Sequence, residues 1–422
     1  MFNTYKWVNG MKMKSLKQTI SGIALIVGFV LHGQLSFASP EIVGEFVFPE
    51  TSLPRGVAVD SETGNVYVAD HANDEIYIFD GDLNLLGNNI PTDENPYRIA
   101  IDPRPETRRL FVGNFTSGTV EVFSLTSGQL ICSLPAGPGP HPAFNMATEK
   151  LYIGVEGTNT LKVFGDQDSC TFLSELSLGT KPMSVAIDDL ANRVYVAIHH
   201  EQRVSVIDGD NDSVVANIDL IPQGDPTDVA VNPNTHHVYV AYSQGNAVTE
   251  IDTGPLGLGP YEQTNLIVGD GPRYVQVDSD IDRAYVSVIN FLQLGIVTSG
   301  LVEDPLQLDM IPAFTGVNTK THCAYTSGDT SGDDGESFSE VLKICDADDA
   351  CVPTPNGEVG DATGCSIGQL CPCENTWKNH GAYVSCVAHA SEDFLEEGLI
   401  TEEEKDAIVS EAGESDCGDK DK

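Results

Sequence analysis

The chain has 422 residues, enough for one large β-rich domain together with a small second domain. It contains 63 acidic and only 22 basic residues, a formal net charge of −41, so we expect no binding to nucleic acid, which needs clustered cations. The same charge disfavours an anionic membrane surface as a partner.

The first 38 residues have the parts of a secretory signal peptide. A lysine-rich segment precedes an apolar stretch over residues 20–31, which is short for a membrane span. Ser36 and Ala38 then supply the small side chains of a cleavage site before Ser39. An uncleaved anchor is the alternative, and no later segment is apolar enough to cross a bilayer. We therefore expect an exported protein, periplasmic, on the cell surface or secreted, and we expect a monomer.

A repeated unit occupies most of residues 39–350. Each copy has a proline, a short apolar run that ends in Asp or Asn, a turn, and a strand centred on an aromatic residue. The Asp or Asn positions recur every 40 to 46 residues: Asp60, Asp102, Asn145, Asp188, Asn232, Asp278 and Asn318. Six copies place a tyrosine seven residues later, and the second copy has Phe111 after a longer turn. Seven such copies indicate a repeat architecture.

Each copy predicts four short strands. In the clearest copy these cover residues 182–188, 193–197, 203–208 and 213–218. Four strands in about 43 residues are typical of a propeller blade, so we predict a seven-bladed all-β propeller. Small residues recur in the first strand of the copies, which suits crowding near a central axis: Ala58, Ala100, Ala186 and Ala230.

The last copy lacks a convincing fourth strand. Residues 41–48 form an apolar run ahead of the first copy and can supply that strand. We therefore predict that residues 41–48 complete the last blade, which would close the ring and leave fewer exposed strand edges.

The repeat resembles known propeller families. Its Val-Tyr-Val-Ala strands and Val-Ile-Asp-Gly turns resemble the YVTN repeats, and the segment 66–80 resembles an NHL repeat equally well. The resemblance covers about residues 41–350 and implies a propeller fold. The wider group includes lactonases, lyases, quinoprotein dehydrogenase subunits, surface-layer proteins and binding modules, so the resemblance implies no single activity.

One face of a propeller carries the loops around the axial mouth, where sites usually lie. The residues that we expect on this face include four cations in a chain poor in cations. The candidate ligand-binding residues are Arg55, His71, Arg98, His141, Lys181, His199 and Arg273. The cations could hold an anionic ligand such as a carboxylate. Alternatively, they pair with neighbouring acids.

Metal binding is a second possibility, with Ca²⁺ or another divalent cation as the only cofactor we consider. His199 and His200 are adjacent, and because neighbouring residues of a strand point to opposite faces, we do not expect them to chelate together. One of them could join His71 and His141 across blades. The acidic segment 329–340 offers weak calcium ligands at Asp329, Asp333 and Glu340. The histidines at positions 236, 237 and 322 are predicted to be surface turn residues.

The C-terminal part differs from the propeller. Residues 351–364 read as a linker, and residues 365–422 predict two helices, the second opened by a capping box at Thr401 and Glu404. Eight cysteines favour a disulfide framework in an exported protein: Cys323, Cys345, Cys351, Cys365, Cys371, Cys373, Cys386 and Cys417. Cys323 and Cys345 are expected on adjacent strands and could pair. A metal site of Cys371, Cys373, Cys386, His380 and His389 is the alternative, although no Cys-x-x-Cys pair is present. Cys132 and Cys170, on neighbouring blades, could bridge or stay free.

These patterns favour an exported propeller that binds a protein or a cell-surface component and catalyses no reaction. The alternative is a metal-dependent lactonase- or lyase-like enzyme with its site at the axial mouth.

Overall fold

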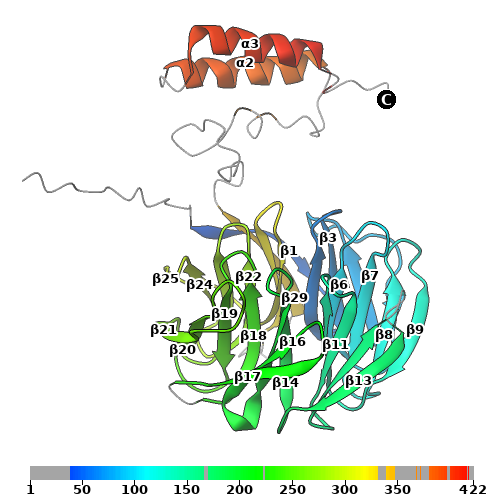
Figure 1. The fold of residues 1–422 in the computed structure, drawn as a ribbon. Helices are drawn as coiled ribbons and strands as arrows, with labels where there is room; N and C mark the ends of the chain where they lie inside the picture. The colour runs from blue at the N-terminus through cyan, green and yellow to red at the C-terminus, as the bar shows by residue number, and fades with distance from the viewer. Residues whose placement is uncertain are drawn as a thin grey trace, which may run out of the picture. The chain divides into compact units, whose positions relative to one another are not determined.

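The computed structural model describes residues 39–165, 170–221, 224–330, 339–346, 367, 371, 380–396, 400–415 and 417. Seven antiparallel sheets make up most of it, and each is one blade of a propeller (Figure 1). The first strand of each blade contacts the first strand of the next, and the last of them contacts the first, so the ring is closed. The predicted seven-bladed fold is confirmed.

Blades 1 to 3 follow the chain from the inner strand to the outer one. Blade 1 has β2 (Pro54–Asp60), β3 (Asn65–Asp70), β4 (Glu75–Phe79) and β5 (Ile90–Pro91). Blade 2 has β6 (Pro96–Asp102), β7 (Arg109–Asn114), β8 (Thr119–Ser124) and β9 (Leu130–Pro135). Blade 3 has β10 (Pro140–Asn145), β11 (Lys150–Val155), β12 (Thr160–Gly165) and β13 (Thr171–Ser177).

Blades 4 to 6 repeat this order, with small additions. Blade 4 has β14 (Pro182–Asp188), β15 (Arg193–Ile198), the 3₁₀ turn η1 (His199–Glu201), β16 (Arg203–Asp208) and β17 (Ser213–Asp219). Blade 5 has β18 (Pro226–Asn232), β19 (His237–Tyr242), β20 (Ala247–Asp252) and β21 (Glu262–Ile267). Blade 6 has β22 (Pro272–Asp278), β23 (Arg283–Val288), β24 (Gln293–Thr298) and a split outer strand of β25 (Leu301–Val302) and β26 (Leu306–Gln307).

Blade 7 is assembled from both ends of the propeller sequence. It contains β27 (Ile311–Asn318), β28 (Cys323–Asp329), β29 (Ser339–Asp346) and, as its outer strand, β1 (Pro40–Val47). β1 pairs antiparallel with β29, with Glu41 opposite Cys345 and Phe46 opposite Val341. The N-terminal strand therefore lies where the sequence predicts a closing strand.

The closing strand also packs on the next blade. The rings of Phe46 and Phe79 lie 4.8 Å apart, and those of Phe48 and Tyr77 lie 4.9 Å apart. β1 thus completes the sheet of blade 7, while Phe46 and Phe48, the latter just after the strand, bury surface of blade 1.

A buried polar residue ends each first strand. The seven recurring Asp and Asn residues are all at most 2% exposed. They accept hydrogen bonds from their own turns, and several also reach the next blade. Asp188 accepts from His236 Nδ1 at 2.7 Å, Asp278 from His322 Nδ1 at 2.9 Å, and Asn145 donates to Asn192 at 2.9 Å. These contacts join consecutive blades through polar groups that would be costly to bury alone.

The histidines of these turns are therefore not surface residues, contrary to our expectation. His236 and His322 have positive φ angles of 59° and 55°, which turns their side chains toward the carboxylate of the preceding blade. His322 is only 7% exposed. His237 is half-buried and binds Glu250 at 3.0 Å, and this partner raises the pKa of His237.

The tyrosines of the second strands also link blades. Tyr152 donates to Asp212 in the next blade at 2.6 Å, and Tyr325 donates to the carbonyl of Gly81 at 2.7 Å. Both rings are almost fully buried, and burial raises the pKa of Tyr152. A tyrosine at this position fills the interface with its ring and satisfies its hydroxyl on the neighbouring blade.

Disulfides link strands within and between blades. Cys323 and Cys345 are bonded across β28 and β29, as predicted. Cys132 on β9 is bonded to Cys170, just before β13, so this bridge joins the outer strands of blades 2 and 3.

The C-terminal region contains α2 (His380–Glu396) and α3 (Glu402–Glu414). Thr401 and Glu404 form the predicted capping box at the start of α3. Cys371 and Cys386 are joined in a disulfide, and Cys417 is disulfide-bonded too, so these three sulfurs are not zinc ligands. Cys351, Cys365 and Cys373 lie outside the described residues. No helix among the described residues is long and apolar enough to span a membrane.

We predict that Asp278→Ala lowers the free energy of unfolding by about 3 kcal/mol, because it leaves His322 and a turn N–H without their acceptor. Asp280→Ala, an exposed change in the same turn, should cost about 0.5 kcal/mol or less. Urea unfolding of both variants measures the difference. Equal stability of the two variants would show that the buried carboxylate does not hold the blades together.

Candidate functional site

The first strands begin with proline in six blades, and all but one of the residues at the two positions after it line the axial cavities. The residue directly after the proline is Arg55, Tyr97, His141, Met183, Thr227 or Arg273. The second is Gly56, Arg98, Pro142, Ser184, Asp228 or Tyr274. In five of these blades the pairing register shifts here, and such bulges redirect side chains. The bulge explains how consecutive residues can both line the mouth.

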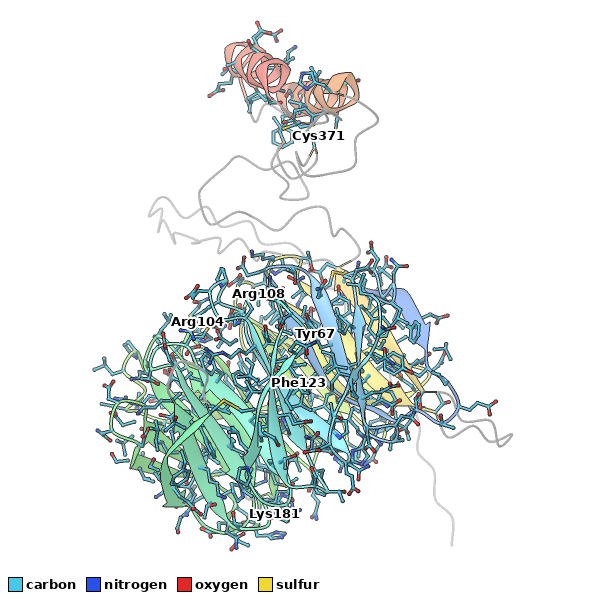
Figure 2. All side chains as sticks on the ribbon, turned by 90° about the vertical axis from the view of Figure 1, so that its right-hand side faces the viewer. Tyr67, Arg104, Arg108, Phe123, Lys181 and Cys371 are labelled. Atoms are coloured by element: carbon cyan, nitrogen blue, oxygen red, sulfur yellow. A yellow bond between two sulfur atoms is a disulfide. The ribbon has the colours of Figure 1, made fainter. Side chains whose placement is uncertain are left out.

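The mouth is a cavity of about 220 Å³ on one face of the propeller. It is lined by His71, Tyr97, Arg98, Phe115, His141, Glu156, Lys181, Met183, Thr227, Arg273 and Tyr274. Figure 2 shows Lys181 at the opposite end of the blades from Arg104 and Arg108. The mouth therefore lies on the predicted loop face, and the turns with the buried Asp and Asn residues lie on the other.

Arg98 and Asp228 cross the axis between blades 2 and 5. Their side chains form an ion pair of 2.8 Å and are 16% and 5% exposed. Asp228 also accepts hydrogen bonds from Ser184 Oγ at 2.5 Å and from the Val275 N–H at 3.0 Å. The guanidinium lies over the ring of Phe314, 4.8 Å from its centroid. The ion pair and the ring contact together fix the position of the Arg98 guanidinium at the floor of the mouth.

Aromatic side chains form one wall of the mouth. Tyr97 and Tyr274 share a hydrogen bond of 2.8 Å between their hydroxyls, again across the axis. Burial raises the pKa of Tyr274, so this hydroxyl stays protonated. Phe115 packs on Tyr97 and remains 37% exposed, while the Arg273 guanidinium lies 5.5 Å from the Tyr274 ring centroid. The wall thus combines flat apolar surface with an exposed cation.

A histidine and a glutamate face this wall. His141 Nε2 lies 2.9 Å from Glu156, and the other carboxylate oxygen lies 3.3 Å from Lys181 Nζ. Burial lowers the pKa of His141, so the ring is neutral near pH 7 and donates from Nε2. Burial alone would raise the pKa of Glu156, but the hydrogen bond from His141 and the charge of Lys181 outweigh it and lower that pKa. Within the described residues, nothing hydrogen-bonds His141 Nδ1, which therefore keeps a free lone pair.

The structure places the predicted residues in two groups. Five of the seven line the mouth together: His71, Arg98, His141, Lys181 and Arg273. Arg55 lies outside this lining and pairs with Asp329 at 3.0 Å. His199 also lies outside it, beside His200. Of the cations, Arg98 and Lys181 pair with acids, as the alternative interpretation expected, yet both still line the cavity.

The structure does not bring the predicted histidine ligands of the mouth together around one ion. In the described part of the chain, neither His71 nor His141 belongs to a group of ligand atoms close enough to share an ion. For the calcium segment, Asp329 ends β28 and Glu340 lies on β29, where burial raises the pKa of Glu340. Asp333 lies outside the described residues, so the calcium site stays a prediction.

Sequence reasoning missed the aromatic and acidic half of the mouth. Tyr97, Tyr274 and Asp228 follow the prolines of their repeats by one or two residues, so aligning the repeats on proline could have found them. Phe115 and Glu156 follow the ends of β7 and β11, directly after the second strand of their blades.

Below the mouth, the channel is a second cavity of about 350 Å³. Its wall is built from the first strands of all seven blades and includes the predicted small residues Ala58, Ala100, Ala186 and Ala230. Arg98, His141 and Tyr274 line both cavities. Most side chains along this channel are small or aliphatic, so the charged and aromatic side chains concentrate at the mouth.

Solved structures share this fold at low identity. Hydrazine synthase from Kuenenia stuttgartiensis has a TM-score of 0.58 at 14% identity, over 68% of this chain and 96% of that one. Virginiamycin B lyase from Staphylococcus aureus has 0.57 at 13%, over 72% and 99%. Raptor from Chaetomium thermophilum has 0.60 at 11%, over 73% and 29%. No protein-family model and no curated protein matches the chain, so the resemblance to YVTN and NHL repeats stays a prediction.

We predict that Arg98 and Asp228 are energetically coupled. Asp228→Asn and Arg98→Met should each cost about 3 kcal/mol of unfolding free energy, since each leaves a nearly buried partner unpaired. The double variant should cost clearly less than the sum of the two. Urea unfolding of all four proteins completes the cycle, and additive costs would contradict a coupled pair.

We predict a pH-dependent contribution from Glu156. Its pKa is lower in the folded chain than in the unfolded one, so its stabilising effect is complete above pH 4.5 and is lost as the pH falls through the folded value. Glu156→Gln should therefore cost about 2 kcal/mol at pH 7, and this difference from the parent protein should shrink in acid. Glu149→Gln, at an exposed ion pair, should show little effect at either pH. Thermal unfolding across pH tests both.

Proposed function

We propose that this chain is an exported binding protein whose axial mouth holds a carboxylate-bearing, partly aromatic or apolar group of a protein or cell-surface component. The observation that carries the proposal is Arg273. Its side chain is exposed at the mouth, its guanidinium lies 5.5 Å from the centroid of the Tyr274 ring, and it has no acidic partner among the described residues. A guanidinium that lies beside an aromatic ring and has no carboxylate partner is suited to bind one.

The rest of the mouth supports this ligand class. Arg98 and Lys181 add positive charge behind Arg273, although Asp228 and Glu156 neutralise much of it. Tyr97 and Phe115 offer ring surface next to the cation. A ligand with a flat or apolar body and one carboxylate would use both features, whereas the Glu156 carboxylate would repel a ligand with several negative charges.

Export is supported by two features. The sequence begins with the pattern of a signal peptide, and the described residues contain three disulfides. Disulfides persist in oxidising compartments. We therefore propose that the protein acts outside the cytoplasm, where a cell-surface component would be available to it.

A lyase-like enzyme is the second candidate, and the His141–Glu156 pair favours it. Neutral His141 donates from Nε2 to the carboxylate, so Nδ1 can accept a proton from a bound molecule. Glu156 would then stabilise the imidazolium, as an acidic partner does in other histidine bases. Burial of Nδ1 in the present arrangement means that a ligand would have to open access to it.

We predict that Arg273→Ala weakens binding of an aromatic carboxylate about 5- to 10-fold, by loss of one charge-assisted hydrogen bond. The probes are phenylacetate and its uncharged counterpart phenylacetamide, measured by ligand-observed NMR or calorimetry. The matched control is Arg55→Ala, since Arg55 has the same place in blade 1 but pairs with Asp329 outside the cavity.

Phenylacetate should bind more tightly than the amide, and the preference should disappear in Arg273→Ala but persist in Arg55→Ala. Equal affinity for both probes would contradict the proposed carboxylate site. Chemical conversion of a bound molecule that is abolished in His141→Ala would instead favour the enzyme.

A further inference from the structure

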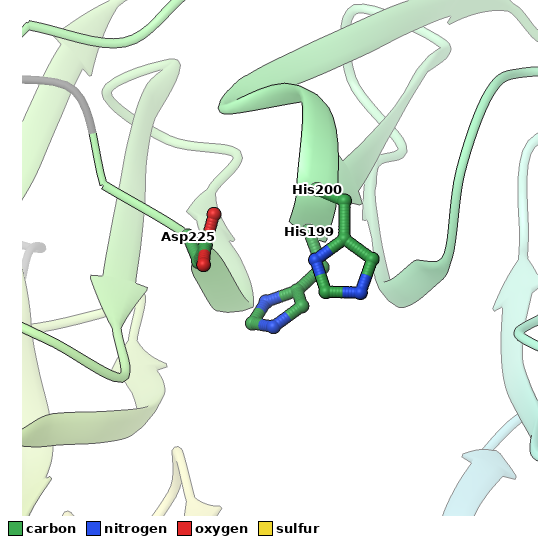
Figure 3. Close-up of side chains that lie close together, drawn as sticks. All are labelled: His199, His200 and Asp225. Carbon is green, nitrogen blue, oxygen red and sulfur yellow. The ribbon is translucent and has the colours of Figure 1, made fainter.

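Three metal-ligating side chains meet beside the mouth in blade 4 and the loop that leads to blade 5. His199 and His200 lie in the turn η1, and Asp225 lies just before β18 (Figure 3). One ligand atom from each of them lies within 4.8 Å of the other two. The two imidazole rings have their centroids 4.6 Å apart.

A break in the strand brings the two histidines together. β15 ends at Ile198, and a 3₁₀ turn follows in place of continued strand. Side chains of consecutive residues alternate between faces only while the strand lasts. The expectation that His199 and His200 point apart is therefore wrong, because they are not in a strand.

One ring is held in place by the backbone. His199 Nδ1 lies 2.9 Å from the carbonyl oxygen of Pro226, which can only accept, so Nδ1 carries the hydrogen and Nε2 keeps its lone pair. When one ring nitrogen of a histidine binds a metal, the N–H of the other usually donates a hydrogen bond such as this one, which orients the ring. Because Pro226 begins β18, this contact also links the turn to the loop that carries Asp225.

The remaining ligand atoms have no competing partner. Among the described residues, no Lys or Arg pairs with the Asp225 carboxylate, and no hydrogen bond is made by that carboxylate, by the His200 ring or by His199 Nε2. Every other histidine within the propeller donates or accepts a side-chain hydrogen bond. His200 is exposed, so its ring can turn toward an ion at little cost.

We propose that His199, His200 and Asp225 bind a first-row transition metal ion, and Zn²⁺ is the ion that this set of ligands suits best. Two imidazoles and a carboxylate suit zinc and its neighbours, while Ca²⁺ prefers oxygen ligands throughout. Three protein ligands leave a fourth position for water. The excess of acidic over basic residues in the chain also favours cations over anions as ligands.

The site is separate from the proposed carboxylate site. It uses none of the residues that line the mouth, although His200 lines an adjoining cavity of about 330 Å³ that shares Phe115, Glu156 and Lys181 with the mouth. Metal binding here can therefore succeed or fail independently of Arg273.

The test is zinc binding by the purified full chain after treatment with a chelator. Calorimetric titration with Zn²⁺ should show one equivalent bound. His200→Gln should lower the zinc affinity at least about 10-fold, because loss of a partner that only supports a ligand already lowers metal affinity by that much. His237→Gln is the matched control, since it alters the other adjacent histidine pair, in which His236 and His237 already bind Asp188 and Glu250.

A second measurement covers the carboxylate. Asp225→Asn should weaken zinc binding as well, and zinc should raise the thermal unfolding temperature of the parent protein and of His237→Gln more than that of either site variant. Far-UV circular dichroism checks that the variants are folded. Equal zinc affinity in His200→Gln and His237→Gln would overturn the proposal, and so would displacement of zinc by millimolar Ca²⁺.

Discussion

The propeller depends on one polar side chain per blade, buried where the first strand ends. A carboxylate or amide at most 2% exposed is tolerated only if its hydrogen bonds are satisfied. The turn that follows it supplies some of them, and in several blades a residue of the next blade supplies another, as His236 does for Asp188 and His322 for Asp278. At these positions a directional contact sets one blade on its neighbour, and the apolar interfaces between blades add most of the buried area.

This arrangement leaves the opposite ends of the first strands free to vary. With one end fixed, the residues after the strand's proline need only point toward the axis, and the bulge at this position lets two in succession do so. Arg98, Asp228 and Tyr274 hold equivalent positions in three blades, yet meet in one cluster. A nearly repetitive backbone thus creates an asymmetric site, because seven copies of one position carry different side chains.

The features that recur in every blade could be predicted from the sequence, whereas the contacts between side chains of different blades could not. The buried Asp and Asn, the tyrosines and the closing strand recur or complete a pattern, so spacing alone revealed them. Which side chains would meet across the axis depends on distances between blades, and no spacing encodes the Tyr97–Tyr274 contact. The predicted orientations of two histidines were wrong for local reasons. A 3₁₀ turn replaces the strand at His199, and a positive φ turns the His236 side chain inward. Each is a departure from regular strand geometry, on which the sequence argument relied.

The excess of acidic residues opposes the binding of an anion at the mouth and favours the binding of a cation at the histidine and aspartate cluster. Its field repels an anion approaching the mouth, so a carboxylate must be held by short-range contacts such as those of Arg273 and the rings around it. Screening over roughly 8 Å at physiological ionic strength confines the field to the nearest charges, of which Glu156 is one. At the other site the nearest acid is the Asp225 carboxylate, which attracts a cation and pairs with no Lys or Arg among the described residues. A surface that disfavours anions in general can therefore still bind one where a cation without an acidic partner lies beside aromatic rings, as Arg273 does.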